Sequence, residues 1–567
     1  MTEPARSVAR DLLLLAGATL LLVGPGIGLR DPWPPDEPRF ILVAGEMLAS
    51  SQWLVPVRAG EIYADKPPVF LWLEALVLAL TGSRRLAFQL PSLASALLTV
   101  ILTYDLGRRL WSRRVGLWSA GVLLASVQFV MQARSGQIDA TLTALTTLGL
   151  YGVVRHGLLG PAWGWYLTGF AVMGLGVMTK GVGFLPALAL IPLVWSHRRG
   201  WCRLGPPPDW RWWSGLAALL LALSLWLAPL LVVTLDGGPA LTTYRDELLL
   251  GQTAERYVDP QGHREPPWYY LTVLPGLWLP ASAALPWLLP AWRRRLRRRD
   301  ARYLLLLGWV VLVLLFFSLS PGKRGVYLLP ALPAFALAVG PLVPGLWRRI
   351  GLQRVGYALT LLLGLVALGG AAGIATAPRM VAAAAGTPVA SLTAPLAILG
   401  TLAVVSGLVA RPRRGFLALL ATLAVAWWIL GLWIYPVFDA ERSGAALMAA
   451  ARERLPTDAE LAIVDWREQM ILHADRPVTH FGYRTEVGEQ ARRGAAWVAR
   501  VPSRRVLIPA SLLEPCFRSG DAEPVALAHR HRWTVVGPTD VSGQCPGWPQ
   551  TGIRYVPPYV VAVHARR

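Results

Sequence analysis

Long apolar runs separated by short polar segments dominate this chain. Thirteen of the runs approach the 17–25 mostly apolar residues that a membrane-spanning helix requires. They predict a polytopic α-helical membrane protein with about 13 transmembrane helices. The predicted spans lie at 10–28, 86–108, 114–131, 138–155, 163–180, 182–197, 212–235, 268–290, 302–319, 325–345, 352–375, 392–410 and 414–436.

Clusters of arginine flank these runs on one predicted side of the membrane. With the N-terminus in the cytoplasm, every dense cluster falls in a cytoplasmic loop, as the positive-inside bias requires. The clusters lie at 107–114, 197–203, 293–300, 346–354 and 411–414. The same topology places two long polar loops, 29–85 and 236–267, on the outer face.

One further apolar run, 69–80, does not fit as a span. If it crossed the membrane, every later segment would reverse and the arginine clusters would lie outside. About 14 helical residues also reach only about 21 Å, which is shorter than the hydrocarbon core. The run is therefore predicted as a re-entrant or interfacial helix that begins after Pro67-Pro68, with a tilted short span as the alternative.

The chain after the last span is more polar, so 1–436 is predicted as the transmembrane domain and 437–567 as a small periplasmic α/β domain. Cys516 and Cys545 both lie in this outer domain, where a disulfide is chemically allowed, and their pairing is left open. Cys202 is predicted as a free cytoplasmic thiol. An amphipathic helix is expected at 441–455, and strands are expected at 461–466, 505–510, 533–537 and 559–565.

Composition supports the membrane assignment and changes the meaning of the charge. Hydrophobic residues make up 54% of the chain and charged residues only 16%, against roughly 25% in soluble domains. A net charge of +22 would suggest nucleic acid as the partner of a soluble protein. Here the basic residues stand between apolar runs, so membrane orientation explains them and no nucleic-acid partner is implied.

Lysine is rare, and its positions are informative. Of the 55 basic residues, three are lysines, namely Lys66, Lys180 and Lys323. All three fall at the outer membrane edge in a topology that arginines alone define. A single lysine there can be a snorkelling anchor, but clustered cations at this depth are suited to a phosphate whose lipid tail lies in the bilayer.

Neighbouring polar residues also have ordinary structural explanations. Arg134 and Asp139 can pair with each other across a tight turn. Asp36 and Glu37 can be solvated acids or can cap a helix expected at 39–48. All these explanations would have to hold on one membrane face, which favours a shared functional site.

Six motifs occur in order along most of the chain. Together they resemble the polyprenyl-phosphate-sugar-dependent glycosyltransferases with the GT-C fold, a group that includes the protein mannosyltransferases and the lipid A aminoarabinose transferase. The likeness is greatest to the aminoarabinose transferase type. The motifs are D-E-P-R-F (36–40), the stretch that follows to Glu46-Met47, Y-A-D-K-P-P (63–68), R-S-G-Q-I-D (134–139), T-K-G (179–181) and K-R-G-V-Y-L-L-P-A-L-P (323–333).

The resemblance assigns roles to particular residues. It implies that Asp36 is the catalytic or catalysis-supporting carboxylate and that Arg39 follows one helical turn later, facing the same cavity. Lys66 matches the basic residue near the lipid phosphate. The other residues implied or expected to bind the lipid phosphate or the sugar are Tyr63, Asp65, Asp139, Lys180, Arg256, Lys323, Arg324 and Tyr327.

Metal binding is linked to the same region in some members of the group. Asp65 stands where a longer glutamate is expected, and the nearest histidine is His263. A divalent metal at Asp65 and His263 is therefore left open, and no cofactor is required with certainty.

The resemblance implies transfer of a sugar from an undecaprenyl-phosphate carrier, with inversion, on the periplasmic face of the inner membrane. The acceptor is lipid A, another glycolipid or a protein. Cleavage of the anomeric C–O bond releases an anionic lipid phosphate, which positioned cations stabilise. Asp36 is the candidate general base if the acceptor is a hydroxyl. If the acceptor is a phosphate, Asp36 instead orients it or holds a sugar or a cation.

Two other classes of function remain as alternatives. A flippase or transporter of lipid-linked sugars would place ionisable residues near the middle of spans and would contain internal repeats. Here the charges cluster at one surface, and no clear repeat is found. A scaffold that displays the C-terminal domain would leave Asp36 and the outer cations without a common purpose. The sugar, the acceptor, the metal and the oligomeric state stay open.

Overall fold

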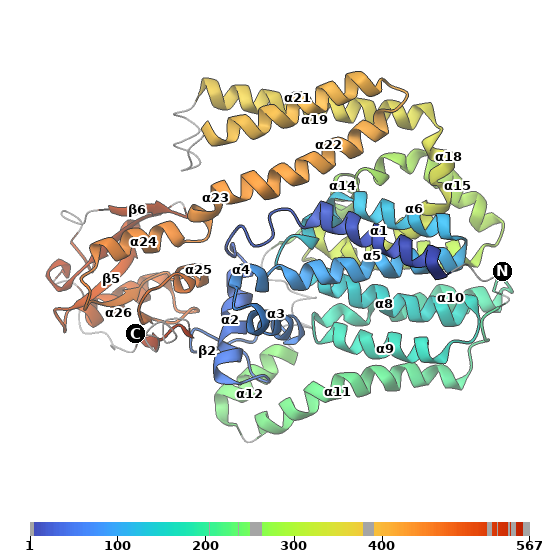
Figure 1. Ribbon diagram of the computed structural model, residues 1–567. Helices are drawn as coiled ribbons and strands as arrows, with labels where there is room; N and C mark the ends of the chain where they lie inside the picture. The colour runs from blue at the N-terminus through green and yellow to red at the C-terminus, as the bar shows by residue number, and fades with distance from the viewer. Residues whose placement is uncertain are drawn as a thin grey trace.

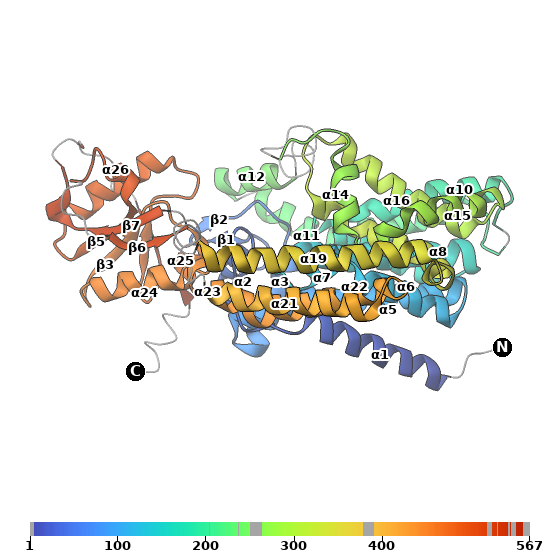
Figure 2. The ribbon, with the colours of Figure 1, turned by 90° about the horizontal axis from the view of Figure 1, so that it is seen from above.

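The computed structural model describes residues 5–202, 204–235, 237–249, 263–377, 390–518, 524–529, 531–542, 545 and 552–558. Most of these residues are helical. The helices lie side by side in a bundle, and a β-sheet with its own helices lies beyond one end of that bundle (Figure 1). The long helices between residues 350 and 429 form the upper edge of the bundle in Figure 1 and lie in front of the other helices in the view from above (Figure 2).

The bundle contains fewer clear spans than the sequence predicts. By length and composition, seven helices of the described chain can cross a membrane, or up to nine if each of two bent helix pairs is one span. The bends are 71° between α6 and α7 and 106° between α14 and α15. This establishes a helical, multi-pass membrane protein, whereas the count of thirteen spans is not confirmed.

The helices of the bundle match the predicted apolar runs closely in position. Their bounds are α1 Ala5–Val23, α5 Leu90–Leu110, α6 Arg113–Ala125, α7 Val127–Ala133, α8 Ile138–Leu159, α9 Trp163–Val177, η1 Gly181–Ala189, α10 Leu190–Arg198, η2 Trp210–Trp212, α11 Trp213–Leu235, α12 Gly238–Asp246, α14 Tyr269–Leu277, η4 Ala281–Ala284, α15 Leu285–Arg297, α16 Ala301–Leu319, η5 Gly325–Ala331, α17 Leu332–Val339, η6 Gly340–Leu342, α18 Val343–Trp347, α19 Ile350–Thr376, α21 Ala390–Ala410, α22 Gly415–Ile429 and the π-helical turn η7 Leu430–Ile434.

Arginine-rich connections gather at one end of the bundle. The turns that follow α5, α10, α15, α18 and α21 all lie at the end away from the β-sheet (Figure 1). Helix α15 illustrates this composition, because its sequence ends in RRRLR and three arginines lie in its last turn. The separation of these turns from the sheet agrees with the single-sided charge pattern of the sequence.

Short elements lie between the bundle and the sheet. They are α2 Glu37–Ser50, β1 Val57–Arg58, β2 Glu61–Ile62, α3 Val69–Thr81 and α4 Arg84–Ala87 (Figure 1). The apolar helix α3 follows Pro68 and is capped at its C-terminus by Gly82. Gly82 has a left-handed backbone (φ +64°), and its N–H donates a hydrogen bond to the Leu78 carbonyl. It is a short apolar helix of 13 residues and not a candidate span. The helix expected at 39–48 is present as α2.

The C-terminal region contains a six-stranded mixed sheet with strand order β6-β7-β5-β3-β4-β8. β3 pairs in parallel with β4 and β5, and the other pairings are antiparallel. Its core buries Trp466 and Trp533. The elements are α23 Tyr435–Arg442, α24 Ala445–Arg454, β3 Glu460–Ile463, α25 Glu468–Leu472, β4 Val478–His480, α26 Val487–Val498, β5 Arg504–Pro509, η8 Ala510–Leu512, β6 Pro524–Ala528, β7 His531–Val536, η9 Pro538–Asp540 and β8 Ile553–Tyr555.

Three of the four predicted strands are present as β3, β5 and β7. The fourth, at 559–565, lies outside the described residues. The helix predicted at 441–455 is divided, because Gly444 adopts a left-handed backbone (φ +77°) between α23 and α24. The last helix of the bundle, α22, continues through η7 into α23 without a linker.

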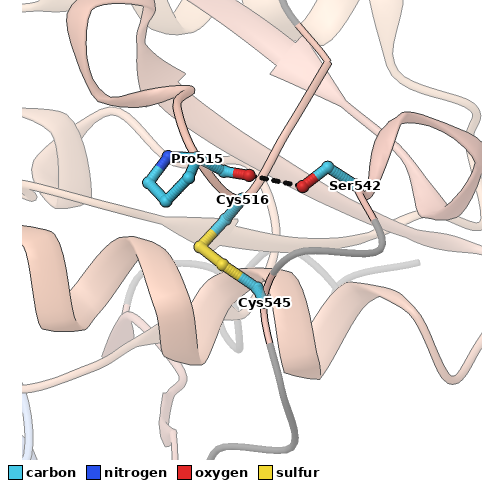
Figure 3. The surroundings of a disulfide bond; sticks show 4 residues. All are labelled: Pro515, Cys516, Ser542 and Cys545. Atoms are coloured by element: carbon cyan, nitrogen blue, oxygen red, sulfur yellow. Dashed lines mark hydrogen bonds between the residues drawn. A yellow bond between two sulfur atoms is a disulfide. The ribbon is translucent and has the colours of Figure 1, made fainter.

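A disulfide joins Cys516 to Cys545, with their Cα atoms 5.2 Å apart (Figure 3). The Ser542 hydroxyl donates to the Pro515 carbonyl beside it, and the Ser542 N–H donates to the Cys516 carbonyl (2.9 Å). The pairing that the sequence left open is therefore formed. Cys202 carries a free thiol that donates to the Gly157 carbonyl.

Candidate active site

Helix α2 presents two of the predicted residues together. Asp36 precedes its first turn and Arg39 lies three positions later, with Pro38 between them favouring the helix start. The Asp36 carboxylate makes no capping hydrogen bond. Instead, its Oδ1 lies 3.8 Å from Nη1 of Arg39. Asp36 is therefore a partly exposed carboxylate directed at a cation, and the capping role is not observed.

Glu37 has a structural task that the sequence did not reveal. Its carboxylate receives two hydrogen bonds from Arg30, at 2.5 and 2.7 Å, and one from the Gly136 N–H at 2.9 Å. Both side chains of the pair are almost fully buried. The pair joins the start of α2 to the turn before α8, and so fixes the position of Asp36 relative to Asp139.

Asp65 lies among three guanidinium groups. Its carboxylate is 3.9 Å from Arg39, 4.0 Å from Arg58 and 4.0 Å from Arg484. Arg58 comes from β1, and Arg484 from the loop after β4. Arg484 also pairs with Glu247 through two hydrogen bonds. Three guanidinium groups at one place supply the donors that an anionic ligand requires. Neither Arg58 nor Arg484 was predicted, since their motifs carry no local signal.

Glu468, the first residue of α25, reaches the same cations from the C-terminal region. Its Oε1 accepts a hydrogen bond from Nε of Arg39 at 3.0 Å and lies 3.6 Å from Nη1 of Arg58. Burial lowers the pKa of Arg39, but nearby carboxylates, first Glu468, raise it more, so the net shift is upward. Arg39 therefore stays charged whatever the working pH.

Aromatic rings enclose Arg58. Its guanidinium lies 3.5 Å from the ring centroid of Tyr483 and 5.4 Å from that of Tyr63. Such cation–π contacts stabilise a guanidinium that burial has removed from water. Tyr63 is itself buried, which raises the pKa of its hydroxyl above the usual value. Tyr63, one of the predicted residues, thus lies beside Arg58 with its hydroxyl protonated.

A second group of predicted residues lies at the ends of α8 and α9. Nζ of Lys180 contacts Oδ1 of Asp139 at 2.7 Å and lies 4.5 Å from the ring centroid of Tyr327. The alternative pairing of Arg134 with Asp139 is wrong. Arg134 instead donates to the carbonyls of Leu22 and Pro25, which closes the turn after α1.

Packing connects the two groups. Ile138, next to Asp139, lies in one apolar cluster with Tyr63 and Phe40 of α2. Met178, near Lys180, packs against Ala64, and its carbonyl accepts the N–H of Val69 at 3.2 Å. The segment that carries Asp65 and Lys66 therefore runs between the two groups, and Lys66 is partly buried there.

Lys323 is placed differently from the prediction. It is almost fully buried, and its ammonium donates to the carbonyls of Glu265 at 2.8 Å and Ser320 at 2.6 Å. These contacts join two loops, so the structure does not bring its Nζ to the carboxylates around Arg39. Arg324 follows at the start of η5, partly exposed, and Arg256 lies outside the described residues.

The described residues were also tested for a metal. They contain no group of three or more His, Cys, Asp or Glu side chains arranged to hold one. His263 is exposed, and its carbonyl receives the N–H of Lys323. The three guanidinium groups around Asp65 are an unfavourable setting for a dication. In the part of the chain that the structure describes, the residues do not form the metal site considered at Asp65 and His263.

Known proteins resemble this chain in sequence and in fold. Residues 65–228 match the family described as dolichyl-phosphate-mannose-protein mannosyltransferase. The structure is similar to the crystal structure of ArnT from Cupriavidus metallidurans bound to undecaprenyl phosphate, with a TM-score of 0.72, 21% identity, and coverage of 94% of this chain and 98% of that one. This likeness shows the fold, which is that of a polytopic membrane protein of the GT-C class.

Two relatives are named undecaprenyl phosphate-alpha-4-amino-4-deoxy-L-arabinose arabinosyl transferases. The protein from Pseudomonas fluorescens is 32% identical over 64% of this chain and 65% of its own length. The protein from Pseudomonas savastanoi pv. phaseolicola is 32% identical over 63% of this chain and 67% of its own length. The match to the first relative therefore spans slightly less than two thirds of that protein. The chain belongs to the family of GT-C polyprenyl-phosphate-sugar glycosyltransferases of the aminoarabinose transferase type.

Proposed function

We propose that the protein is an integral-membrane glycosyltransferase that moves a sugar from an undecaprenyl-phosphate carrier to an acceptor. Lipid A, another glycolipid and a protein are the acceptor classes considered. The observation that carries the proposal is the convergence of Asp36, Arg39 and Asp65 at the junction between the bundle and the C-terminal sheet. A carboxylate beside clustered guanidinium groups at a bundle end is suited to an anionic lipid donor.

The relatives suggest which donor to test first. Their names specify undecaprenyl phosphate as the carrier and 4-amino-4-deoxy-L-arabinose as the sugar. Both the phosphate of the carrier and the amino sugar are compatible with a site that offers cations and carboxylates. The phosphate would meet Arg39 and Lys66, and an amino sugar would find carboxylates at Asp36, Asp65 and Asp139.

The chemistry is a single displacement. An acceptor oxygen attacks the anomeric carbon, and the bond from that carbon to the phosphate oxygen breaks with its electron pair remaining on the lipid phosphate. Arg39, fixed by its ion pairs, and Lys66 stabilise the charge that develops there. When the acceptor is a hydroxyl, its proton passes to the Asp36 carboxylate. When the acceptor is a phosphate, no proton is transferred and Asp36 orients it.

The proposed topology has thirteen spans with the site facing the periplasm. The nine candidate spans, together with α1, α8, α9 and the continuous pair η1–α10, add up to that number. The arginine-rich turns at the opposite end support a cytoplasmic location for that end (Figure 1). The proposed division into 1–436 and 437–567 falls in the first turn of α23.

Substitution of Asp36 tests the proposal. With an acceptor hydroxyl, Asp36→Asn should reduce the turnover number of sugar transfer by about 10²–10⁴-fold, the usual contribution of a general base. Folding and binding of undecaprenyl phosphate should change little. The assay is mass spectrometry of the glycolipid formed by purified protein in liposomes. The control is Glu453→Gln, at an exposed position of α24. Transfer at the wild-type rate by Asp36→Asn would contradict the catalytic role.

A further inference from the structure

Glu468 belongs to the C-terminal region, yet its carboxylate contacts a proposed donor-binding residue, Arg39. It begins α25, which packs against α2 beside the proposed catalytic residues (Figure 1). Its partner Arg39 lies 429 positions earlier in the sequence. The C-terminal region thus supplies a side chain directly behind the cation that is proposed to bind the donor phosphate.

The contact holds Arg39 through both its charge and its geometry. The Glu468 carboxylate accepts a hydrogen bond from Nε of Arg39 at 3.0 Å. The terminal nitrogens of the guanidinium are therefore available for other contacts. Nη1 lies 3.8 Å from Asp36 and 3.9 Å from Asp65. Because a guanidinium is planar and rigid, holding Nε at one edge fixes the direction of the opposite edge.

Burial makes the contact difficult to replace. The side chain of Glu468 is 5% exposed and that of Arg58 is 6% exposed. A desolvated carboxylate requires partners, and Glu468 is shared by Arg39 and Arg58. Tyr483 covers one face of Arg58, so this second guanidinium is also held from the C-terminal side.

We propose that Glu468 is a positioning residue for sugar transfer. It orients Arg39, with Arg58 behind it, so that the edge of the guanidinium opposite Nε, beside Asp36 and Asp65, is presented to the phosphate of the donor. The C-terminal region therefore contributes a positioning residue to the donor site. This inference rests on the proposed function, because it assumes that a lipid-linked phosphate is the ligand.

The primary test is Glu468→Gln in the full-length protein reconstituted in lipid nanodiscs. We expect the KM for the undecaprenyl-phosphate sugar to rise about tenfold, within the range of coupling seen between contacting residues, with a much smaller change in kcat. Asp465→Asn is the matched control, since Asp465 pairs with Arg467 in the same region and its left-handed backbone (φ 54°) is well tolerated by Asn. The control should keep the wild-type KM.

A double-mutant cycle separates positioning from general stabilisation. Arg39→Lys removes the fork that Glu468 holds, so adding Glu468→Gln to it should raise KM little further. Independent effects that multiply would overturn the proposal, as would a wild-type KM in Glu468→Gln. If Glu468→Gln does not fold, Glu468→Asp takes its place. It keeps the charge on a shorter side chain and should give an intermediate KM, and a wild-type KM there would also overturn the proposal.

Binding of undecaprenyl phosphate alone distinguishes this inference from the proposed function. Native mass spectrometry measures the bound fraction for the wild type and for Glu468→Gln. If the wild type neither binds this lipid nor transfers its sugar, the proposed function fails. If the wild type binds it and Glu468→Gln binds it equally well, the proposed function stands and the role of Glu468 is refuted.

Discussion

Glu46 offers a pH-dependent test of the junction that holds the site. Its buried carboxylate accepts the N–H of Ala59 at 2.6 Å and lies 3.5 Å from the N–H of Gly60. These residues form the turn between β1 and β2, both with left-handed backbones. Burial raises the pKa of Glu46 from 4.5 to about 7, and the N–H of Ala59 only partly opposes this shift. Glu46→Gln removes the titration but keeps a carbonyl oxygen that can accept the same N–H.

The sign and size of the effect follow from linkage. The folded protein holds the proton of Glu46 more tightly than the unfolded chain does, so this contribution to stability is complete below about pH 4.5 and is lost as the pH rises through about 7. A shift of about 2.5 units corresponds to about 3 kcal/mol of unfolding free energy. Burial lowers the pKa of nearby His480, which produces the opposite trend. That trend is common to both proteins and cancels in their difference.

The measurement is thermal unfolding of the two proteins in nanodiscs at pH 5 and pH 8. We expect nearly equal Tm values at pH 5 and a Tm several degrees higher for Glu46→Gln at pH 8. Glu453→Gln is the control, because Glu453 is an exposed residue of α24, and it should follow the wild-type profile. Parallel profiles for the wild type and Glu46→Gln would refute the assignment of a buried, proton-holding carboxyl.

Two further predictions concern an ion pair and the disulfide. At 2.7 Å the attraction between Lys180 and Asp139 is about 6 kcal/mol at an effective dielectric constant of about 20, most of it offset by desolvation. A double-mutant cycle of Lys180→Met and Asp139→Asn, with the unfolding free energy measured for each protein, should yield a coupling free energy of about 1–3 kcal/mol. Additive effects of the two substitutions would contradict a direct interaction between these side chains. The disulfide closes a sequence separation of 29 residues, so Cys516→Ala with Cys545→Ala should destabilise the C-terminal region by about 3–4 kcal/mol. Unchanged hydrogen exchange there would contradict this value.

The sequence predicted those parts of the site that depend on local spacing. Asp36 and Arg39 are adjacent because they are three residues apart at a helix start, and the motif around Lys180 predicts an outer helix end. The positions of the long helices also followed from continuous apolar runs. Two breaks, after α6 and after α14, were not anticipated, since a bend leaves the apolar content unchanged.

Residues that act across long separations were missed. Glu468 stands in a polar stretch with no periodic signal, and its value comes only from tertiary contact with Arg39. Arg58 belongs to a two-residue strand that is too short to predict. Lys323 was expected at the lipid phosphate because it lies near a span end. Its actual partners are backbone carbonyls, which no side-chain motif can reveal.

The contact between Arg39 and Glu468 also orders events during biosynthesis. Arg39 emerges from the ribosome 429 residues before Glu468. Similarly, 421 positions separate Ala59 from His480, whose ring contacts the Ala59 carbonyl. Contacts of such long range form late. A nascent chain arrested before α25 would contain Asp36, Arg39 and Asp65 but would lack the carboxylate that aligns them. If the proposed role of Glu468 holds, the donor site would be complete only after α25 has been made.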